Sequence, residues 1–124
     1  MQPGTGSTRE KGDLGEEMAA DLLVRLGYCI TSRKWRFARY ELDLVAENET
    51  HIVFVEVKLR YSNTYGEPWE AVNKGKRKKI CLSADAFIRE FAIGKEPRFD
   101  IISIIRSGNK YEVLHIENAF WPTA

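Results

Sequence analysis

The sequence predicts an α/β fold in which a mixed sheet of four to five strands is flanked by helices, in the order helix, three strands, helix, strand. Two segments, 14–26 and 80–91, carry apolar residues at the spacing of one helix face. Segments 40–46 and 51–59 instead alternate polar and apolar residues and are rich in β-branched and aromatic side chains, which is typical of strands. A chain of 124 residues with 44% hydrophobic residues can bury one core, so we expect one domain.

The N-terminal segment 1–11 lacks periodicity, so we expect a flexible tail before a single domain over 12–120, with a short C-terminal tail at 121–124. The first helix is expected to begin after Asp13, a suitable N-cap, and to end at Gly27. Asp13 and Glu16 have the spacing of a capping box, in which the glutamate bonds back to the helix start. Glu16 could therefore cap the helix, contribute to a site, or do both.

The first strand is expected over 28–32, and the strands at 40–46 and 51–59 should form an antiparallel hairpin with a loop of two to four residues. An even loop length decides which residues share a face. One face then carries Leu42, Leu44 and Ala46 with Val53, Val55 and Val57. The other carries Glu41, Asp43 and Val45 with Ile52, Phe54, Glu56 and Lys58.

The second helix is expected to begin near Asn73 and to be followed by strands over 101–105 and 111–116, with a turn at 107–109. A loop over 61–69 should precede this helix. Its aromatic residues could form an exposed stacking surface or fold over the core, and we expect Trp69 to cover the core.

Two carboxylates and an ammonium group, from Asp43, Glu56 and Lys58, should gather at the end of the hairpin that lies away from its turn. Carboxylates are the ligands that Mg²⁺ or Mn²⁺ takes in proteins, usually with water and substrate phosphate oxygens. Such an ion can polarise a phosphodiester and activate water, while Lys58 orients that water or stabilises developing charge. The alternative is a structural charge cluster in which Lys58 only neutralises the two acids.

Basic residues gather around this group, although the formal net charge is only +1 and excludes a uniformly basic protein. Several interleave with aromatic residues just before Asp43, a pattern that suits phosphate binding and base stacking. An ordinary solvated surface is the alternative interpretation. The expected contacts to nucleic acid are Arg33, Arg36, Arg39, Arg60 and Lys76.

Other classes of protein are excluded by what the chain lacks. It has no apolar run near the roughly 20 residues of a membrane span, and its N-terminus lacks a signal peptide, so we expect a cytoplasmic protein without a membrane partner. Cys29 and Cys81 are too few for a disulfide framework and are expected to be reduced, buried thiols. No zinc site is expected.

Motifs that follow one another over residues 12–120 are Gly15-Glu16 with Ala19 and Leu23, Gly27-Tyr28, Glu41 to Ala46, Val53 to Arg60, Tyr65-Gly66, Lys76, Arg98 to Asp100 and Asn118 to Phe120. This ordered series resembles the YraN family of small bacterial proteins, also called UPF0102. The resemblance implies a restriction-endonuclease-like core of the PD-(D/E)xK superfamily. It implies that Asp43, Glu56 and Glu16 hold a metal ion and that they act in catalysis together with Lys58.

One departure is Tyr40, which stands where the family usually has glycine. The preferred hypothesis is a metal-dependent nuclease that hydrolyses phosphodiester bonds in structured or branched DNA. By analogy with Holliday-junction resolvases, it would act as a homodimer in DNA repair or recombination. Two alternatives stay open, namely a catalytically inactive nucleic-acid-binding module with this fold and a protein-interaction module.

Overall fold

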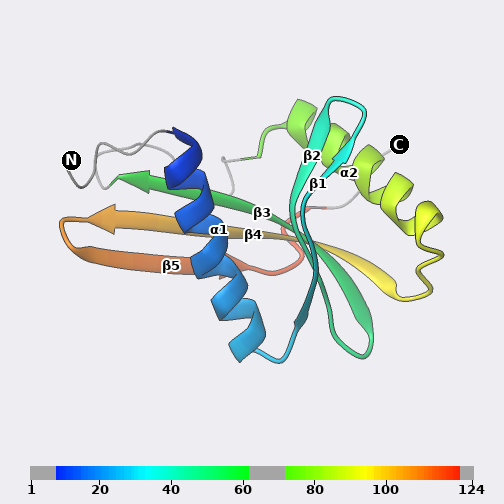
Figure 1. Ribbon diagram of the computed structural model, residues 1–124, viewed down its shortest axis with the longest axis horizontal. Helices are drawn as coiled ribbons and strands as arrows, with labels where there is room; N and C mark the ends of the chain where they lie inside the picture. Colours follow the sequence, from blue (N-terminus) through cyan, green and yellow to red (C-terminus); the bar gives the residue numbers. More distant parts are fainter. Residues whose placement is uncertain (1–7, 62–71, 121–124) are drawn as a thin grey trace.

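The structure, a computed structural model, describes residues 8–61 and 72–120. Two helices lie on opposite faces of a five-stranded sheet (Figure 1). The predicted mixed α/β fold with two helices is confirmed. Its elements are α1 (Thr8–Arg25), β1 (Cys29–Phe37), β2 (Tyr40–Glu47), β3 (His51–Tyr61), α2 (Lys74–Glu90), β4 (Glu96–Ser107) and β5 (Lys110–Ile116).

The strands lie in the sheet in the order in which they occur in the chain, β1-β2-β3-β4-β5. Three of the four neighbouring pairs are antiparallel, and only β3 and β4 run parallel. Two parallel strands need a long crossover connection. Here the connection from β3 to β4 contains α2. The sheet is therefore mixed, as the sequence predicts. None of the described helices has the length and apolar character needed to span a membrane.

Each face of the sheet has its own core. On one face, Ala19, Ala20 and Leu23 of α1 pack against buried aliphatic residues of β2, β3 and β4. On the other face, Phe87 of α2 meets Phe54 edge to face, with ring centroids 5.9 Å apart. The second core is the aromatic one, and it also contains Trp35, Phe99 and Phe120.

The predicted faces of the central hairpin are confirmed near its turn. Glu47 pairs with Ile52 and Leu44 pairs with Val55, so the loop length is even. Leu44, Ala46, Val53 and Val55 all belong to the core under α1, whereas Val45, Ile52 and Phe54 belong to the core under α2.

The predicted position of Leu42 is wrong, because it lies in the core under α2 rather than with Leu44. Residues two apart in a regular strand share a face, so β2 must change face between these two leucines. β1 changes face opposite them: Arg33 reaches α1, whereas Trp35 packs on the α2 side. Lys34, between them, has a left-handed backbone (φ 49°), which a lysine rarely adopts and which costs on the order of 1 kcal/mol.

Helix α1 starts earlier than predicted. It begins at Thr8, so residues 8–11 are helical and Asp13 lies inside the helix rather than at its N-cap. The segment Arg9-Glu10-Lys11 consists of good helix formers, which explains why the helix continues through Gly12. The capping-box interpretation of Glu16 is therefore wrong.

The other boundaries agree with the predictions to different degrees. Asn73 caps α2, since its side chain accepts a hydrogen bond from the Lys76 amide. β1 extends to Phe37, well beyond the predicted strand, and Cys29 is exposed rather than buried. The predicted N-terminal tail covered residues 1–11, of which 1–7 lie outside the described residues, as do the predicted tail at 121–124 and the aromatic residues Tyr65 and Trp69.

A buried polar network joins β4 and β5 to the start of β1. Asp100 is fully buried and accepts hydrogen bonds from Arg98 (2.8 and 2.9 Å) and from the Asn118 amide (3.0 Å). His115 Nε2 lies 2.7 Å from the same carboxylate, and Arg98 also donates to the Tyr28 hydroxyl (2.6 Å). Burial raises the pKa of Asp100, but these donors together outweigh it and lower the pKa. The network stabilises the fold as a group of mutually satisfied charges.

Candidate metal centre

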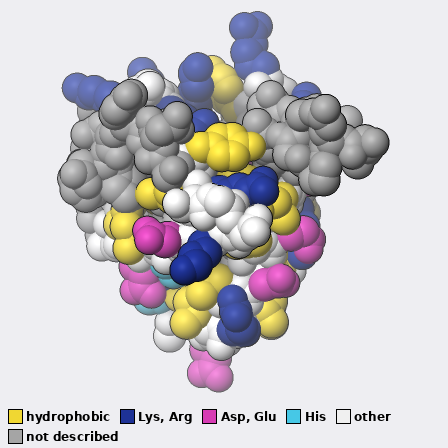
Figure 2. All heavy atoms as spheres, turned by 90° about the vertical axis from the view of Figure 1, so that its left-hand side faces the viewer, with side chains coloured by type: hydrophobic (Ala, Val, Ile, Leu, Met, Phe, Trp, Pro, Cys, Tyr) yellow, Lys and Arg dark blue, Asp and Glu magenta, His cyan; other side chains and the backbone are white. Residues whose placement is uncertain are grey.

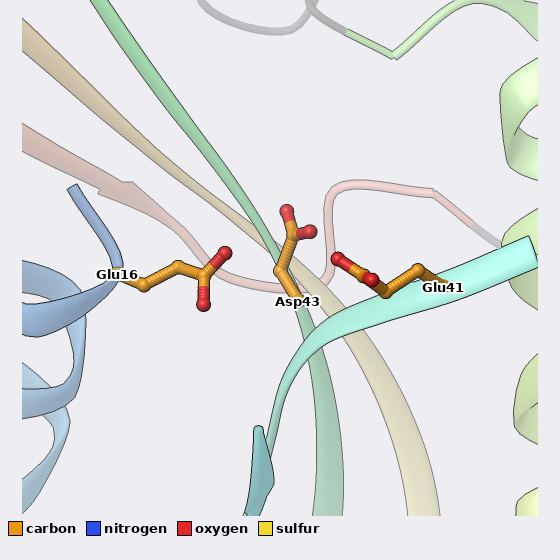
Figure 3. A group of neighbouring side chains, drawn as sticks. All are labelled: Glu16, Glu41 and Asp43. Atoms are coloured by element: carbon orange, nitrogen blue, oxygen red, sulfur yellow. The ribbon is translucent and has the colours of Figure 1, made fainter. Parts of the chain in front are cut away.

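Three carboxylates converge between α1 and the start of β2. Glu16 reaches in from α1, and Glu41 and Asp43 come from β2, with Asp43 in the middle (Figure 3). One oxygen from each of the three lies within 4.8 Å of the others. Oxygen atoms this close can share one hard divalent cation. We refer to Glu16, Glu41 and Asp43 as the carboxylate cluster.

Asp43 is placed by the point at which β2 leaves β3. The ladder between these strands ends at Leu44 and Val55, so Asp43 lies just beyond it. Beyond this point the Asp43 side chain, rather than the β2 backbone, contacts β3. Its Oδ2 accepts a hydrogen bond from the Val57 amide at 2.9 Å. The carboxylate thus fills a gap in the sheet, and its position is fixed.

Glu16 is placed by the close approach of α1 to β3. A Cβ atom on the neighbouring Gly15 would lie 3.3 Å from the Leu59 Cβ and 3.5 Å from a Val57 methyl group. A side chain at position 15 would be tight at this spacing, and glycine allows the close approach. The helix brings Glu16 against the sheet, where only 8% of the residue is exposed.

Burial gives these acids unusual proton affinities. Burial, and then the nearby charge of Asp43, raises the pKa of Glu16 to about 7. Burial also raises the pKa of Asp43, although its hydrogen bond from the Val57 amide opposes the change. Protons and metal ions compete for such carboxylates, so a divalent cation would bind with release of protons near neutral pH.

Glu56 stands next to the carboxylate cluster on β3. Burial, followed by the charge of Asp43, raises the pKa of Glu56 to about 7, and a hydrogen bond between the two side chains favours Glu56 as the protonated partner. Its carboxylate also forms an ion pair with Lys76 of α2. Glu56 therefore lies within reach of Asp43 as predicted, but its cationic partner comes from the second helix.

Lys58 is two residues beyond Glu56 on β3. Its side chain is exposed and forms no ion pair with any residue in 8–61 or 72–120. The structure thus brings together Glu16, Asp43 and Glu56, while Lys58 is left exposed to solvent at the margin of the group.

The basic residues that we expect to contact nucleic acid have different surroundings in the structure. Arg33 forms an ion pair with Glu17 of α1, and Arg36 forms one with Glu41 at 3.4 Å. Arg39 is exposed beside a cavity, and Arg60 is half-buried on β3. Figure 2 shows the side of the molecule that is on the left in Figure 1, and there acidic side chains lie among basic ones in the lower half of the view, whereas the described charged side chains along its upper edge are basic.

Two features of the site were not predicted. Glu41 joins the carboxylate cluster, and its position two residues before Asp43 on one strand was the available signal. Lys34 lies 3.8 Å from Glu16 and also forms an ion pair with Asp13. Nothing in the sequence identifies Lys34 as a neighbour of α1, because its position depends on the change of face in β1.

Comparisons with known proteins agree on one family. Residues 15–104 match the model of the Uncharacterised protein family UPF0102. A UPF0102 protein of Phocaeicola vulgatus is 40% identical over 113 residues, which covers 91% of this chain and 93% of the relative. UPF0102 proteins of Bacteroides thetaiotaomicron and Clostridium acetobutylicum are 41% and 42% identical, each over at least 90% of both chains.

Proposed function

This chain belongs to the UPF0102 family, and we propose that it is a metal-dependent nuclease of the PD-(D/E)xK type with a restriction-endonuclease-like core. The proposal rests above all on one observation, the convergence of Glu16, Glu41 and Asp43 at the gap between β2 and β3. Acidic groups are common on protein surfaces, and Glu41 is exposed, but Glu16 is buried and Asp43 is half-buried. The pKa values of Glu16 and Asp43 are both raised. Perturbed acids gathered in this way are typical of functional sites.

The donor set suits Mg²⁺ or Mn²⁺. All the candidate ligands are carboxylate oxygens, and they belong to the hard class that these ions prefer. Asp43 is the central ligand, Glu16 and Glu41 complete the set, and Glu56 is close enough to Asp43 to join it when deprotonated. Such an ion, when bound, polarises the scissile phosphate and activates a water molecule.

The two lysines have different tasks in this proposal. Lys76 lowers the pKa of Glu56 and so favours its ionised form, which can bind metal or accept a proton from water. Lys58 is exposed on the strand beyond Glu56, where its ammonium group can meet the substrate phosphate and stabilise developing charge.

The proposed substrate is DNA with a structured or branched form. The elements described over residues 8–61 and 72–120 all belong to one sheet and its two helices, so the proposal favours recognition of backbone and shape over recognition of bases. Similarity of the proposed fold to junction-cleaving nucleases supports a homodimer acting on branched DNA, and this step is an analogy between folds.

A second candidate is a nucleic-acid-binding module that does not cut. It is favoured by the ion pairs that already neutralise parts of the site, namely Lys34 with Glu16 and Lys76 with Glu56. In this case the acids and lysines stabilise the fold, and no metal is needed.

A cleavage screen separates the two candidates. Wild type and Asp43→Asn would be incubated with single-stranded, duplex and branched DNA in the presence of Mg²⁺ or Mn²⁺. Asn keeps an acceptor for the Val57 amide but removes the charge, so the fold should persist. Glu49→Gln is the matched control, because Glu49 is an exposed acid in the turn between β2 and β3. Cutting by wild type and the control but not by Asp43→Asn supports the nuclease, and binding without cutting by all three supports the module.

A further inference from the structure

A cavity of about 440 Å³ lies between the start of β2 and the first turns of α2. Arg39, Tyr40 and Glu41 line it from the β1–β2 turn and β2, and Gly75, Lys76 and Lys79 line it from α2. The proposed metal centre does not use most of these residues.

The cavity adjoins the carboxylate cluster because two residues belong to both places. Glu41 supplies one oxygen of the cluster and also forms part of the cavity wall. Lys76 forms the ion pair with Glu56 and lines the cavity from the other side. A group bound in the cavity would therefore be a direct neighbour of a group bound at the cluster.

The wall of the cavity is cationic. Arg39 is exposed and forms no ion pair with any described residue, and the Lys79 ammonium lies 5.8 Å from the centre of the Tyr40 ring. Among the described lining residues Glu41 is the one acid, and Arg36 already pairs with it at 3.4 Å. Two cations are thus available for an anionic ligand.

Backbone amides add to this character. The Asn73 side chain accepts the hydrogen bond of the Lys76 amide, and the Asn73 carbonyl accepts that of Arg77. The amides of Lys74 and Gly75 belong to the first turn of α2, where N–H groups have no acceptor within the helix. The positive end of the helix dipole adds to the positive potential of the cavity.

We infer that this cavity binds a backbone phosphate of an unpaired nucleic-acid strand, next to the phosphate that is cut at the carboxylate cluster. The inference rests on the proposed nuclease function and narrows its substrate class. A cavity of about 440 Å³ is at the small end of ligand sites, roughly 300 to 1,000 Å³, and accommodates one nucleotide rather than a duplex. Arg39 and Lys79 hold the phosphate, and the strand must be single at this point.

Binding of a fluorescein-labelled single-stranded oligodeoxynucleotide of about 20 bases tests the inference, since that length exceeds single-strand site sizes of about 4 to 16 nucleotides. Fluorescence anisotropy would be measured with EDTA present, so that no metal contributes. The test protein is Arg39→Gln/Lys79→Gln. The matched control is Lys78→Gln/Lys110→Gln, which removes two exposed lysines that do not line the cavity.

The cavity variant should bind more than about tenfold more weakly than wild type near 0.1 M salt, with a shallower dependence of affinity on salt, because two phosphate contacts are lost. The control should change affinity less than about twofold. Equal losses in the two double variants, or no measurable binding by wild type, would overturn the inference.

Failure of this inference can be distinguished from failure of the proposed function. Mn²⁺ binding to the cavity variant should equal that of wild type, because neither substituted residue is in the carboxylate cluster. Conversely, Asp43→Asn should bind the oligonucleotide in EDTA at least as tightly as wild type does, because it keeps Arg39 and Lys79 and removes a negative charge near the bound strand. If Mn²⁺ binding depends on Asp43 but Arg39→Gln/Lys79→Gln binds the oligonucleotide as the control does, the metal centre stands and only the phosphate subsite is rejected.

Discussion

Lys76 on α2 forms an ion pair with the carboxylate of Glu56 on β3, and the Glu56 side chain is only 6% exposed. This pair links the second helix to the acids between β2 and β3. The sequence predicted Lys58 beside the acids and Lys76 among the nucleic-acid contacts, whereas in the structure Lys76 contacts a site acid and Lys58 is exposed.

The ion pair predicts an effect of Lys76→Met on metal binding. Lys76 lowers the pKa of Glu56, so its loss should raise that pKa above about 7 and leave Glu56 more protonated at neutral pH. Calorimetric titration of Mn²⁺ at several pH values should show the rise in affinity displaced to higher pH. Lys78→Met, on an exposed position of the same helix, should follow the wild-type profile. A Lys76→Met profile that coincides with wild type would exclude Glu56 from the metal equilibrium.

Lys58 is predicted to act on the substrate rather than on the metal ligands. Lys58→Met should therefore leave Mn²⁺ affinity unchanged and reduce single-turnover cleavage by about 10² or more, the range for loss of one preorganised charge-stabilising group. A parallel loss of Mn²⁺ binding would contradict this division between the lysines.

Without metal, the free energy of unfolding should depend on pH through the buried acids Glu16 and Glu56. The pKa of Glu56 is about 7 in the folded protein and 4.5 as its ordinary value, so between these limits the folded state holds more protons than the unfolded state. The free energy of unfolding should therefore fall as pH rises from 4.5 through about 7. Urea unfolding in EDTA would measure this slope, and Glu16, with its pKa also about 7, adds to it in the same direction.

Glu56→Gln should make that slope smaller. Glutamine has no carboxylate to ionise, so the variant should be more stable than wild type above about pH 7 and similar to it near pH 5. A variant less stable than wild type at high pH would mean that the ion pair with Lys76 outweighs the cost of burying the Glu56 charge.

The Asp100 network should matter for the fold and not for the metal. Asp100→Ala leaves the Arg98 guanidinium partly buried without its main partner, and loss of one member of a buried charge pair costs about 3 to 5 kcal/mol. Urea unfolding would give this value. Asp21→Ala, at an exposed position of α1, should change stability by less than about 0.5 kcal/mol. A small effect at Asp100 would show that the network can be replaced by water.

The periodicity of the sequence was sufficient to predict the sheet, both helices and most faces of the central hairpin. It failed at Leu42, because strict alternation assumes a regular strand and β2 changes face at Asp43. The position of Lys34 could not be predicted for a similar reason. Its backbone is left-handed, and a lysine in the sequence does not indicate such a conformation.

The site was predictable where its residues lie close together in the sequence. Asp43 and Glu56 could be paired from the hairpin register alone. The contact between Lys76 and Glu56 could not, because it depends on how α2 packs on the sheet. Glu16 was predicted as a site residue from the family resemblance, with helix capping as an alternative role. The structure excludes the capping role, because α1 begins at Thr8.

Titration of Mn²⁺ into wild type, Asp43→Asn and the control Glu49→Gln tests the central claim most directly, because it requires no substrate. Asp43 is the middle member of the carboxylate cluster, so its loss should weaken Mn²⁺ binding at least about tenfold, while the fold is retained and Glu49→Gln binds as wild type does. Equal Mn²⁺ affinity for wild type and Asp43→Asn would contradict the assignment of Glu16, Glu41 and Asp43 as a metal centre.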